Sequence, residues 1–295
     1  MNGPLETIAC PCGTALPPRE AFRTPTRRYC LCPACGLVFF SPRPSKRSVM
    51  EFYREEYDTY VGESESGPER APVYRSVLNH LSRFRLPPGR LLDVGCGDGE
   101  FLALCRAQGW TCSGVEISNK AAERAIQRGV TLLPADWLDQ TGAGERTGAF
   151  DVIVLLNVLE SVLDPTVILR RVRTALAPDG LVAIRVSNGA FHLAVRRPAW
   201  WVGARDQQAF HFFVYTPQAL VHHVQSAGFD VVSVRNSRMS EGPVRVANWF
   251  IPALWRVGGA GLWLAAQGLY WLTGGRAVWA PSFEVIARRT KDGAA

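Results

Sequence analysis

The chain has 295 residues, of which 47% are hydrophobic and 20% are charged, and its formal net charge is +7. This composition excludes a disordered or fibrous protein and is sufficient for a substantial folded core. The positive charge is compatible with nucleic acid or anionic lipid as a partner, and equally with solubility alone. No apolar run typical of a signal peptide lies near the first residue, so we expect a cytoplasmic protein and leave peripheral contact with a membrane open.

Cysteines mark the first predicted unit, residues 1–44. Five of the eight cysteines in the chain precede residue 36. Cys32 and Cys35 have the C-x₂-C spacing with which proteins commonly bind zinc, whereas Cys10 and Cys12 are one residue closer together. These four residues predict a structural Zn²⁺ site in a zinc ribbon, because four protein ligands leave no open coordination position. The alternative is a loop-rich cap that holds the same cysteines as reduced thiols.

Residues 45–88 are expected to form a helical cap and linker. Helical patterns cover 45–60 and 72–85. The polar stretch between them, residues 62–70, is typical of a linker or a lid.

A regular alternation of strand, turn and helix begins at residue 89 and continues to residue 239. It predicts a Rossmann-like α/β fold, in which a seven-stranded mixed sheet carries helices on both faces. The last strand follows an insertion and lies in the segment 282–295. The strands are expected at 90–95, 111–116, 130–135, 150–157, 181–188, 229–236 and 282–289.

The sharpest motif follows the first of these strands and reads Asp93-Val-Gly95-Cys-Gly97-Asp-Gly99. Glycines at these positions let the backbone turn tightly and approach a ligand closely. The next strand ends in Glu116, an acid placed to accept hydrogen bonds from a ribose. A dinucleotide fingerprint would need its third glycine at position 100, where this chain has a glutamate that would repel a pyrophosphate. The loop therefore favours a nucleoside without phosphates and with a cationic amino-acid tail, such as S-adenosylmethionine.

Five segments in order resemble the motifs of class I S-adenosylmethionine-dependent methyltransferases: LLDVGCGDGEFL, GVEIS, PADWLD, FDVIVLLNVLESVLDP and LRRVRTALAPDGLVAIRVSN. The chain is most similar to the group that includes ubiquinone-biosynthesis O-methyltransferases and natural-product methyltransferases. This resemblance covers residues 90–236 and 282–289. The cysteine knuckles likewise resemble those that precede the methyltransferase domain in some sugar and secondary-metabolite enzymes.

The resemblance implies a role for each matching position. The three glycines would wrap the methionine part and the ribose, Glu116 would bind the ribose, and Asp93 is placed to attract the ammonium group. Asn157 and Val158 would lie beneath the sulfonium. Contacts with the adenine are expected from Ile117, Asp136 and Trp137. Structural alternatives stay open: a simple tight turn at the glycines, a solvated strand end at Glu116, a helix cap at Asp136 and a core aromatic at Trp137.

The methyl acceptor is expected at the carboxyl ends of the strands, against the segment 192–215, which is rich in histidine, arginine and tryptophan. His211 is the candidate general base, and the alternative is a histidine that caps a turn or is satisfied in the core. Related sequences commonly have a histidine after Leu159-Glu160, at the position where this chain has Ser161. That departure leaves this position without a base.

An apolar, aromatic insertion occupies residues 240–281 and contains five of the nine tryptophans. The 19 residues Val257–Gly275 carry no charge, which is close to the length of ~18 residues that suggests a membrane span. We reject a span, because this run holds six glycines and the chain must return to complete the sheet. Peripheral membrane contact, a lipophilic acceptor tunnel, a lid and a homodimer interface through residues 245–280 all remain open.

These features together predict S-adenosylmethionine-dependent methyl transfer to a small-molecule acceptor. The methylated atom would be an oxygen or a carbon of a lipophilic, phenolic or sugar-linked biosynthetic intermediate. An RNA methyltransferase is a weaker alternative, because no surface with interleaved basic and aromatic residues is evident, and nucleic acid is not the expected partner. The intact glycine loop disfavours a third alternative, a non-catalytic scaffold.

Overall fold

The computed structural model describes residues 4–24, 26–57, 70–137, 147–194, 211–238 and 250–290, with only the backbone described for residues 250–260. Most of the expected linker 62–70, up to residue 69, lies outside these ranges, as do residues 195–210 of the expected acceptor segment.

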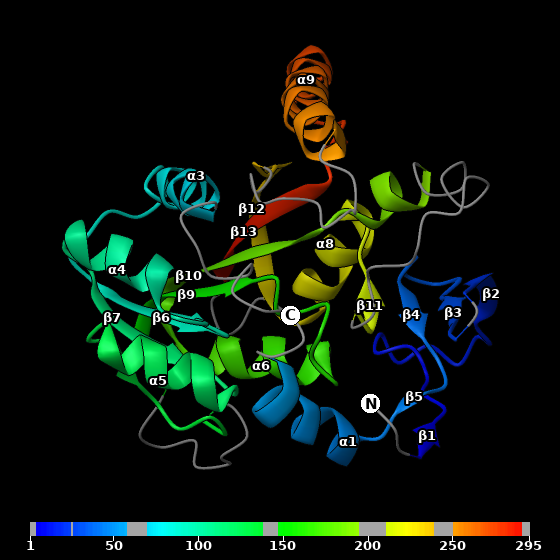
Figure 1. The fold of residues 1–295 in the computed structure, drawn as a ribbon, viewed down its shortest axis with the longest axis horizontal. Helices are drawn as coiled ribbons and strands as arrows, with labels where there is room; N and C mark the ends of the chain where they lie inside the picture. Colours follow the sequence, from blue (N-terminus) through cyan, green and yellow to red (C-terminus); the bar gives the residue numbers. More distant parts are fainter. Residues whose placement is uncertain are drawn as a thin grey trace.

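A seven-stranded sheet forms the centre of the molecule (Figure 1), as the alternation of strands and helices predicted. Its strand order is β12-β13-β10-β9-β6-β7-β8. Only β13 runs antiparallel to its neighbours, β10 and β12, and the remaining pairs are parallel. The strands are β6 (Arg90–Val94), β7 (Thr111–Val115), β8 (Thr131–Leu132), β9 (Phe150–Leu156), β10 (Leu176–Ser187), β12 (Phe229–Asn236) and β13 (Ser282–Arg289).

Helices cover both faces of this sheet. On one face lie α3 (Ala71–Leu81), α4 (Glu100–Ala107) and α5 (Asn119–Gln127). On the other face lie α6 (Pro165–Ala175) and α8 (Pro217–Ser226).

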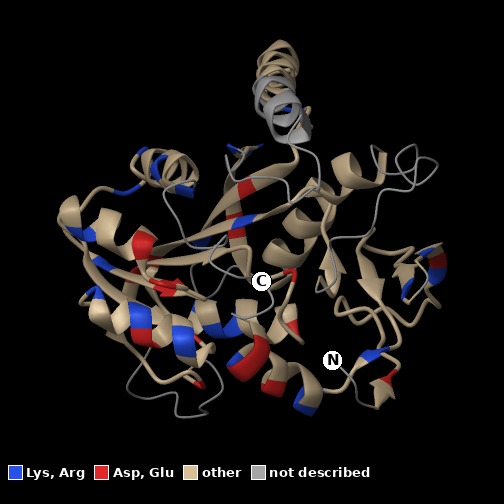
Figure 2. Cartoon of the chain, viewed as in Figure 1, with Lys and Arg blue, Asp and Glu red and all other residues tan. Residues whose placement is uncertain are grey.

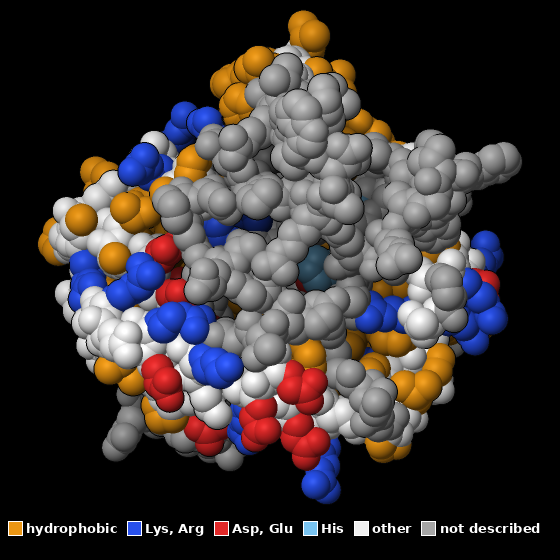
Figure 3. Space-filling view, viewed as in Figure 1, with side chains coloured by type: hydrophobic (Ala, Val, Ile, Leu, Met, Phe, Trp, Pro, Cys, Tyr) orange, Lys and Arg blue, Asp and Glu red, His pale blue; other side chains and the backbone are white. Residues whose placement is uncertain are grey.

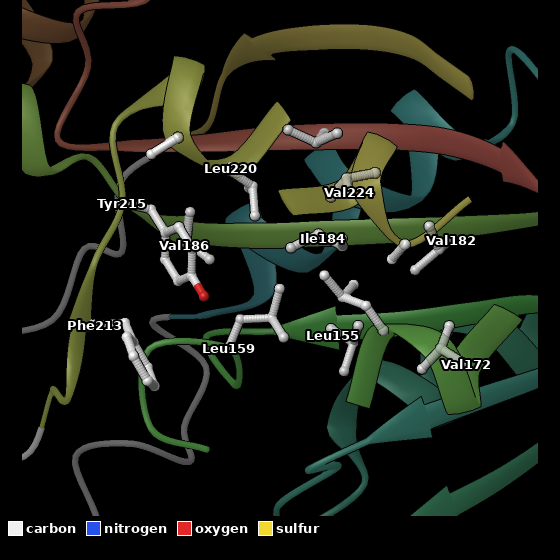
Figure 4. Close-up of a cluster of buried hydrophobic side chains, with 14 of the residues drawn as sticks. Leu155, Leu159, Val172, Val182, Ile184, Val186, Phe213, Tyr215, Leu220 and Val224 are labelled. Carbon is white, nitrogen blue, oxygen red and sulfur yellow. The ribbon is translucent and has the colours of Figure 1, made fainter. Parts of the chain in front are cut away.

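Strand β10 shows why two separate cores form. Val182, Ile184 and Val186 belong to the cluster under α6 and α8 (Figure 4), whereas Leu181 and Ala183 belong to the cluster under α3 and α4. Successive side chains of a strand point to opposite faces, so an apolar strand of this kind is stable only when both faces are covered.

Side-chain caps fix the starts of three helices. Ser118 accepts a hydrogen bond from the Ala121 amide, and Asp164 accepts from the amides of Thr166 and Val167. Thr216 caps α8 in the same way and is followed by proline at the first helical position, where the fixed φ of proline suits a helix start.

The N-terminal region forms a small antiparallel sheet with the order β11-β4-β3-β2. Its fourth strand, β11 (Phe213–Val214), comes from the second half of the chain and pairs with β4. The sequence ended the ribbon at residue 44, and the structure adds this distant strand to it. The other strands of the region are β1 (Leu5–Glu6), β2 (Arg19–Arg23), β3 (Arg28–Leu31), β4 (Val38–Phe40) and β5 (Arg43–Pro44).

Three predicted elements differ in extent. The helix expected over 45–60 is α1 (Lys46–Glu51) continued by a π-helix, η1 (Phe52–Glu56), and residues 58–60 are not described. The third strand has two residues instead of six, because its backbone pairs only with β7 at the edge of the sheet. The fifth strand begins five residues early, at Leu176, with an irregularity before Leu181.

The apolar insertion contains a 23-residue helix, α9 (Phe250–Leu272), which lies at the top of Figure 1 and contacts β12 through its second half. Within the described parts of the chain, no helix combines the length and the hydropathy needed to cross a membrane.

Candidate functional site

The glycine loop between β6 and α4 has the conformation that its sequence predicted. Gly95, Gly97 and Gly99 have φ angles of 73°, 52° and 78°, which side chains rarely adopt. A Cβ atom on Gly95 would lie 2.7 Å from Cγ2 of Val158, so the loop packs directly against the end of β9. A Cβ on Gly97 would have no atom within 4 Å. The loop therefore leaves open space at its centre.

Glu116 lies at the carboxyl end of β7 and holds this loop in place. Its Oε2 accepts a hydrogen bond of 2.8 Å from the amide of Gly97. Its Oε1 accepts from the amides of Ile117 and Ser118, each at 2.8 Å. Glu116 is thus no solvated strand end, because its carboxylate joins the turn after β6 to the turn after β7.

Asp93 is buried beneath the same loop, with 2% of its surface exposed. Within the described part of the chain, its Oδ1 has no hydrogen-bond partner. Burial, and next the charge of Glu116, raise the pKa of Asp93 well above the usual value of an aspartate. A buried carboxylate without a partner is costly and is suited to pair with a cationic ligand group.

Asn157 follows β9 on the other side of the loop and has a φ of 60°, a strained conformation for a residue with a side chain. Its amide donates to the carbonyl of Arg185, and its Oδ1 accepts a hydrogen bond from Nη1 of that arginine. Its Nδ2 donates to Oε1 of Glu160 at 3.3 Å. These contacts hold the strained residue in one orientation.

Two buried charged residues that contact Asn157 were not predicted from the sequence. They are Arg185 and Glu160. Arg185 is 7% exposed and also donates to Oγ of Ser237. Glu160 is fully buried, and its Oε2 has no partner among the described residues. The signal in the sequence was a single arginine within an apolar strand, a residue that proteins bury only when it is paired.

Asp136 and Trp137 follow β8, the strand at the edge of the central sheet. Trp137 is 6% exposed and packs edge-on against Phe150, with ring centroids 5.6 Å apart, so its ring belongs to the core. Asp136 borders a cavity of about 500 Å³ beside α1. The lining residues of this cavity are Lys46, Arg47, Met50, Arg54, Ala135 and Asp136. The glycine loop and Glu116 are not among them. The cavity therefore adjoins only the part of the candidate site where the adenine is expected.

His211 precedes β11 and is half-buried. The two residues after it, Phe212 and Phe213, donate their amides to the carbonyl of Glu160 at 2.7 and 3.1 Å. The segment that carries His211 therefore lies against the loop after β9, which also carries Asn157 and Val158.

The comparisons with known proteins agree with this geometry. The family described as a methyltransferase domain matches residues 68–234, which is more than half of the chain. The chain belongs to this family. Among curated proteins, the ubiquinone biosynthesis O-methyltransferase of Caulobacter sp. (strain K31) is 36% identical over 107 residues, which is 34% of this chain and 41% of that protein. The first curated relatives are matched over 41% to 68% of their own length, so the chain spans about half of each.

Solved structures show the same fold. The 1,6-didemethyltoxoflavin-N1-methyltransferase of Burkholderia thailandensis, solved with bound 1,6-didemethyltoxoflavin and S-adenosylhomocysteine, superposes with a TM-score of 0.52 at 16% identity. The match covers 93% of this chain and 99% of that one. A SAM-dependent methyltransferase from Archaeoglobus fulgidus gives a TM-score of 0.52 at 17% identity and covers 79% and 100% of the two chains.

Beside the methyltransferase domain, the four expected cysteines come together. The Sγ atoms of Cys10 and Cys35 are 3.5 Å apart, those of Cys12 and Cys32 are 3.6 Å apart, and all four lie within 4.8 Å of one another. Thiolates around one Zn²⁺ at about 2.3 Å stand roughly 3.8 Å apart, so the quartet fits a tetrahedral ion. Cys30 lies outside the quartet, with its Sγ 3.9 Å from the carbonyl of Ser41.

The quartet is in contact with the methyltransferase domain. Nε2 of His223, on α8, lies 3.5 Å from Sγ of Cys35, and the hydroxyl of Thr166, on α6, donates to the carbonyl of Pro11. Hydrogen bonding from Cys10, and also from His223, lowers the pKa of the Cys35 thiol to about 3. This shift favours the thiolate of Cys35, the form in which cysteine binds metal. Of the adjacent pair on α8, His223 faces inward and His222 is exposed.

Proposed function

We propose that this chain transfers the methyl group of S-adenosylmethionine to a small-molecule acceptor. The observation that carries the proposal is the buried carboxyl group of Asp93, whose Oδ1 has no partner among the described residues, beneath a glycine loop with open space at Gly97. A ligand with a cationic amino-acid tail and no phosphates would satisfy that carboxylate. Membership of the methyltransferase family and the fold shared with enzymes of this kind support the proposal.

Each residue of the site would then have one task. Asp93 would pair with the ammonium group, and Gly95, Gly97 and Gly99 would bring backbone close to the methionine part. Glu116 would offer its carboxylate to the ribose hydroxyls. Asn157 and Val158 would line the methyl-bearing end. The adenine would lie beside Ile117 and Asp136, whereas the ring of Trp137 packs in the core against Phe150.

The bound cofactor supplies an electrophilic methyl carbon on a sulfonium. An acceptor oxygen or carbon forms the new bond to that carbon while the carbon–sulfur bond breaks, and the electron pair stays on sulfur. The acceptor loses one proton, which His211 would take up. Holding the acceptor in line is the larger contribution of the protein, because positioning alone supplies much of such a rate.

We further propose that Cys10, Cys12, Cys32 and Cys35 bind a structural Zn²⁺. The separations between their sulfur atoms and the lowered pKa of Cys35 support a metal site over a set of reduced thiols. An ion with four protein ligands would have no position for a substrate.

For the acceptor, we propose a lipophilic, phenolic or sugar-linked intermediate methylated at oxygen or carbon. The curated relatives act in ubiquinone biosynthesis according to their names, which favours the lipophilic and phenolic members of this set. Methyl transfer from labelled cofactor to a panel of catechols, polyprenylated phenols and nucleotide-linked sugars would identify the class.

Cofactor binding can be tested before the acceptor is known. Replacing Glu116 by alanine removes three hydrogen bonds to backbone amides and the proposed contact with the ribose. We expect the dissociation constant for S-adenosylmethionine, measured by calorimetry, to rise at least about tenfold, since hydrogen bonds to charged groups are worth ~1.5–3 kcal/mol. Glu123→Ala is the control, because it removes an exposed carboxylate from α5. The proposal fails if the unaltered protein does not bind the cofactor.

A further inference from the structure

The second half of α9 is anchored to the sheet by one of its faces. The hydroxyl of Tyr270 donates to the carbonyl of Val234 on β12 at 3.1 Å, and Nδ2 of Asn236 donates to the carbonyl of Ala266 at 3.0 Å. Ala266 is 3% exposed. These contacts fix which side of the helix faces the methyltransferase domain.

The opposite face is also apolar but is uncovered. Leu264, Leu269 and Leu272 are 63%, 41% and 88% exposed, and adjacent to them Trp271 is 69% exposed. At about 100° per residue, Leu264, Trp271 and Leu272 lie within one arc of roughly 100°, opposite Ala266 and Tyr270, and Leu269 lies at the margin of that arc. Figure 3 shows hydrophobic side chains gathered at the end of the molecule where Figure 1 places α9. Exposed apolar patches of this kind mark sites of interaction.

The stretch of sequence that contains this face carries charges of one sign. Between Glu241 and Glu284 the sequence contains no acidic residue and three arginines, Arg245, Arg256 and Arg276. Arg276 is exposed four residues after the end of the helix, and Figure 2 shows no acidic colour on the part of α9 that is not grey. Tryptophan beside basic residues is typical of segments that lie in the interface of a membrane.

A second copy of the chain fits this face less well. In a two-fold symmetric dimer the same patch meets itself, so the exposed Arg276 beside the patch would face a partner surface with the same positive charge. The segment offers no carboxylate to pair with this arginine. An anionic lipid surface, in contrast, provides negative headgroups for the arginines and an apolar layer for the leucines.

We propose that the uncovered face of α9, together with Trp271, docks onto the surface of an anionic lipid bilayer. The helix lies along the interface with Leu264, Leu269 and Leu272 inserted, while the anchored face keeps contact with β12. This inference is independent of the proposed function, because none of these residues belongs to the cofactor site.

Vesicle flotation of the full chain tests the proposal. The probes are vesicles of phosphatidylcholine alone and of phosphatidylcholine with phosphatidylglycerol at a ratio of roughly three to one, a composition chosen to give a negative surface. We expect the chain to float with the mixed vesicles and to be released by high salt. Leu264→Ser combined with Leu272→Ser should weaken binding at least about tenfold, because two inserted leucines are lost.

The control is Leu86→Ser combined with Ile126→Ser, which removes two side chains of similar exposure, 66% and 60%, away from α9. Binding equal to that of the unaltered chain is expected. The proposal is overturned if the unaltered chain does not float, or if both double variants bind alike. It is also overturned if light scattering shows a dimer that the α9 variant abolishes while vesicle binding persists. Unchanged binding of S-adenosylmethionine by the α9 variant would separate this test from that of the proposed function.

Discussion

The three glycines of the cofactor loop share a left-handed backbone conformation but have different surroundings. A Cβ on Gly99 would lie 2.4 Å from Cγ2 of Val130, inside the distance at which atoms repel strongly. A Cβ on Gly97 would enter open space. Glycine is therefore needed at position 99 for packing, whereas the space beside Gly97 is available to a ligand.

Alanine at these two positions should separate stability from binding. Gly99→Ala is expected to lower the free energy of unfolding by roughly 3 kcal/mol, because an overpacked contact with Val130 adds to the backbone strain. Gly97→Ala should cost only about 1–2 kcal/mol from strain, yet weaken S-adenosylmethionine binding more than Gly99→Ala does. Urea unfolding and calorimetry provide the two measurements. Equal losses of stability, or unaffected binding in Gly97→Ala, would contradict this assignment.

At the residue scale, the sequence predicted those site residues whose positions follow from short motifs at the ends of strands. Gly95, Gly97 and Glu116 follow two adjacent parallel strands, so their proximity follows from the fold class itself. Arg185 was missed, because its partners Asn157 and Ser237 are distant in sequence, and the spacing of residues along the chain does not specify such contacts. Glu160 was also missed, although one of its partners, Asn157, is only three residues away.

At the scale of elements, the ribbon and the methyltransferase domain share a sheet. Phe213 pairs with Phe39 and Val214 with Val38, so β11 is the edge strand of the ribbon. The sequence predicted the quartet from the local knuckles but not this pairing, because a two-residue strand leaves no periodic pattern. The backbone just after His211 is thus held by the same sheet whose strands carry the cysteine loops.

Loss of the proposed metal should therefore loosen β11. In Cys32→Ser we expect zinc content to fall from about one ion per chain to near zero, because three thiolates bind the metal poorly. Amide exchange of Val38 and Val214, which pair with each other, and of Phe40, whose amide donates to the carbonyl of Phe212, should quicken at least about tenfold, whereas β6 in the central sheet keeps its protection. Hydrogen exchange read by mass spectrometry, with metal analysis, makes the measurement.

Cys30→Ser is the matched control, since Cys30 is buried in the same ribbon but lies outside the quartet. This variant should retain its zinc, and the amides of β4 and β11 should remain protected from exchange. The interpretation is wrong if the two variants lose metal alike, or if Cys32→Ser loses metal without any change at β11.

At the scale of the whole molecule, a buried polar network connects distant parts of the chain to the site. Glu284 on β13 is 2% exposed and accepts hydrogen bonds from Arg235 on β12, from His80 on α3 and from Ser237. Ser237 in turn accepts from Arg185, which holds Asn157. The helix before the glycine loop and the final two strands are thereby tied to the residue expected beneath the methyl group.

This network predicts how the molecule responds to acid. Burial lowers the pKa of His80, so between the ordinary histidine pKa of about 6.5 and its lower native value the unfolded chain binds a proton that the native protein does not. Burial raises the pKa of Glu284, but the hydrogen bond from His80 and the charge of Arg235 outweigh it, and the net shift is downward. Stabilisation by Glu284 is therefore present above the pKa of an unfolded glutamate and is lost as the pH falls through the native value. Both groups make the free energy of unfolding decrease as the pH is lowered.

Glu284→Gln should remove the more acidic part of this pH dependence and cost about 3 kcal/mol at neutral pH, because it leaves Arg235 and its neighbours without the buried carboxylate. Urea unfolding at pH of about 7.5, 5.5 and 3.5, which lie above, between and below the ordinary pKa values of histidine and glutamate, separates the contributions of His80 and Glu284. Asp230→Asn, which alters an exposed carboxylate on β12, should retain the full slope and most of the stability. If Glu284→Gln unfolds with the same midpoint and slope as the unaltered chain, the network does not stabilise the fold, and the strained backbone of Asn157 must be held by its remaining contacts with Glu160 and the carbonyl of Arg185.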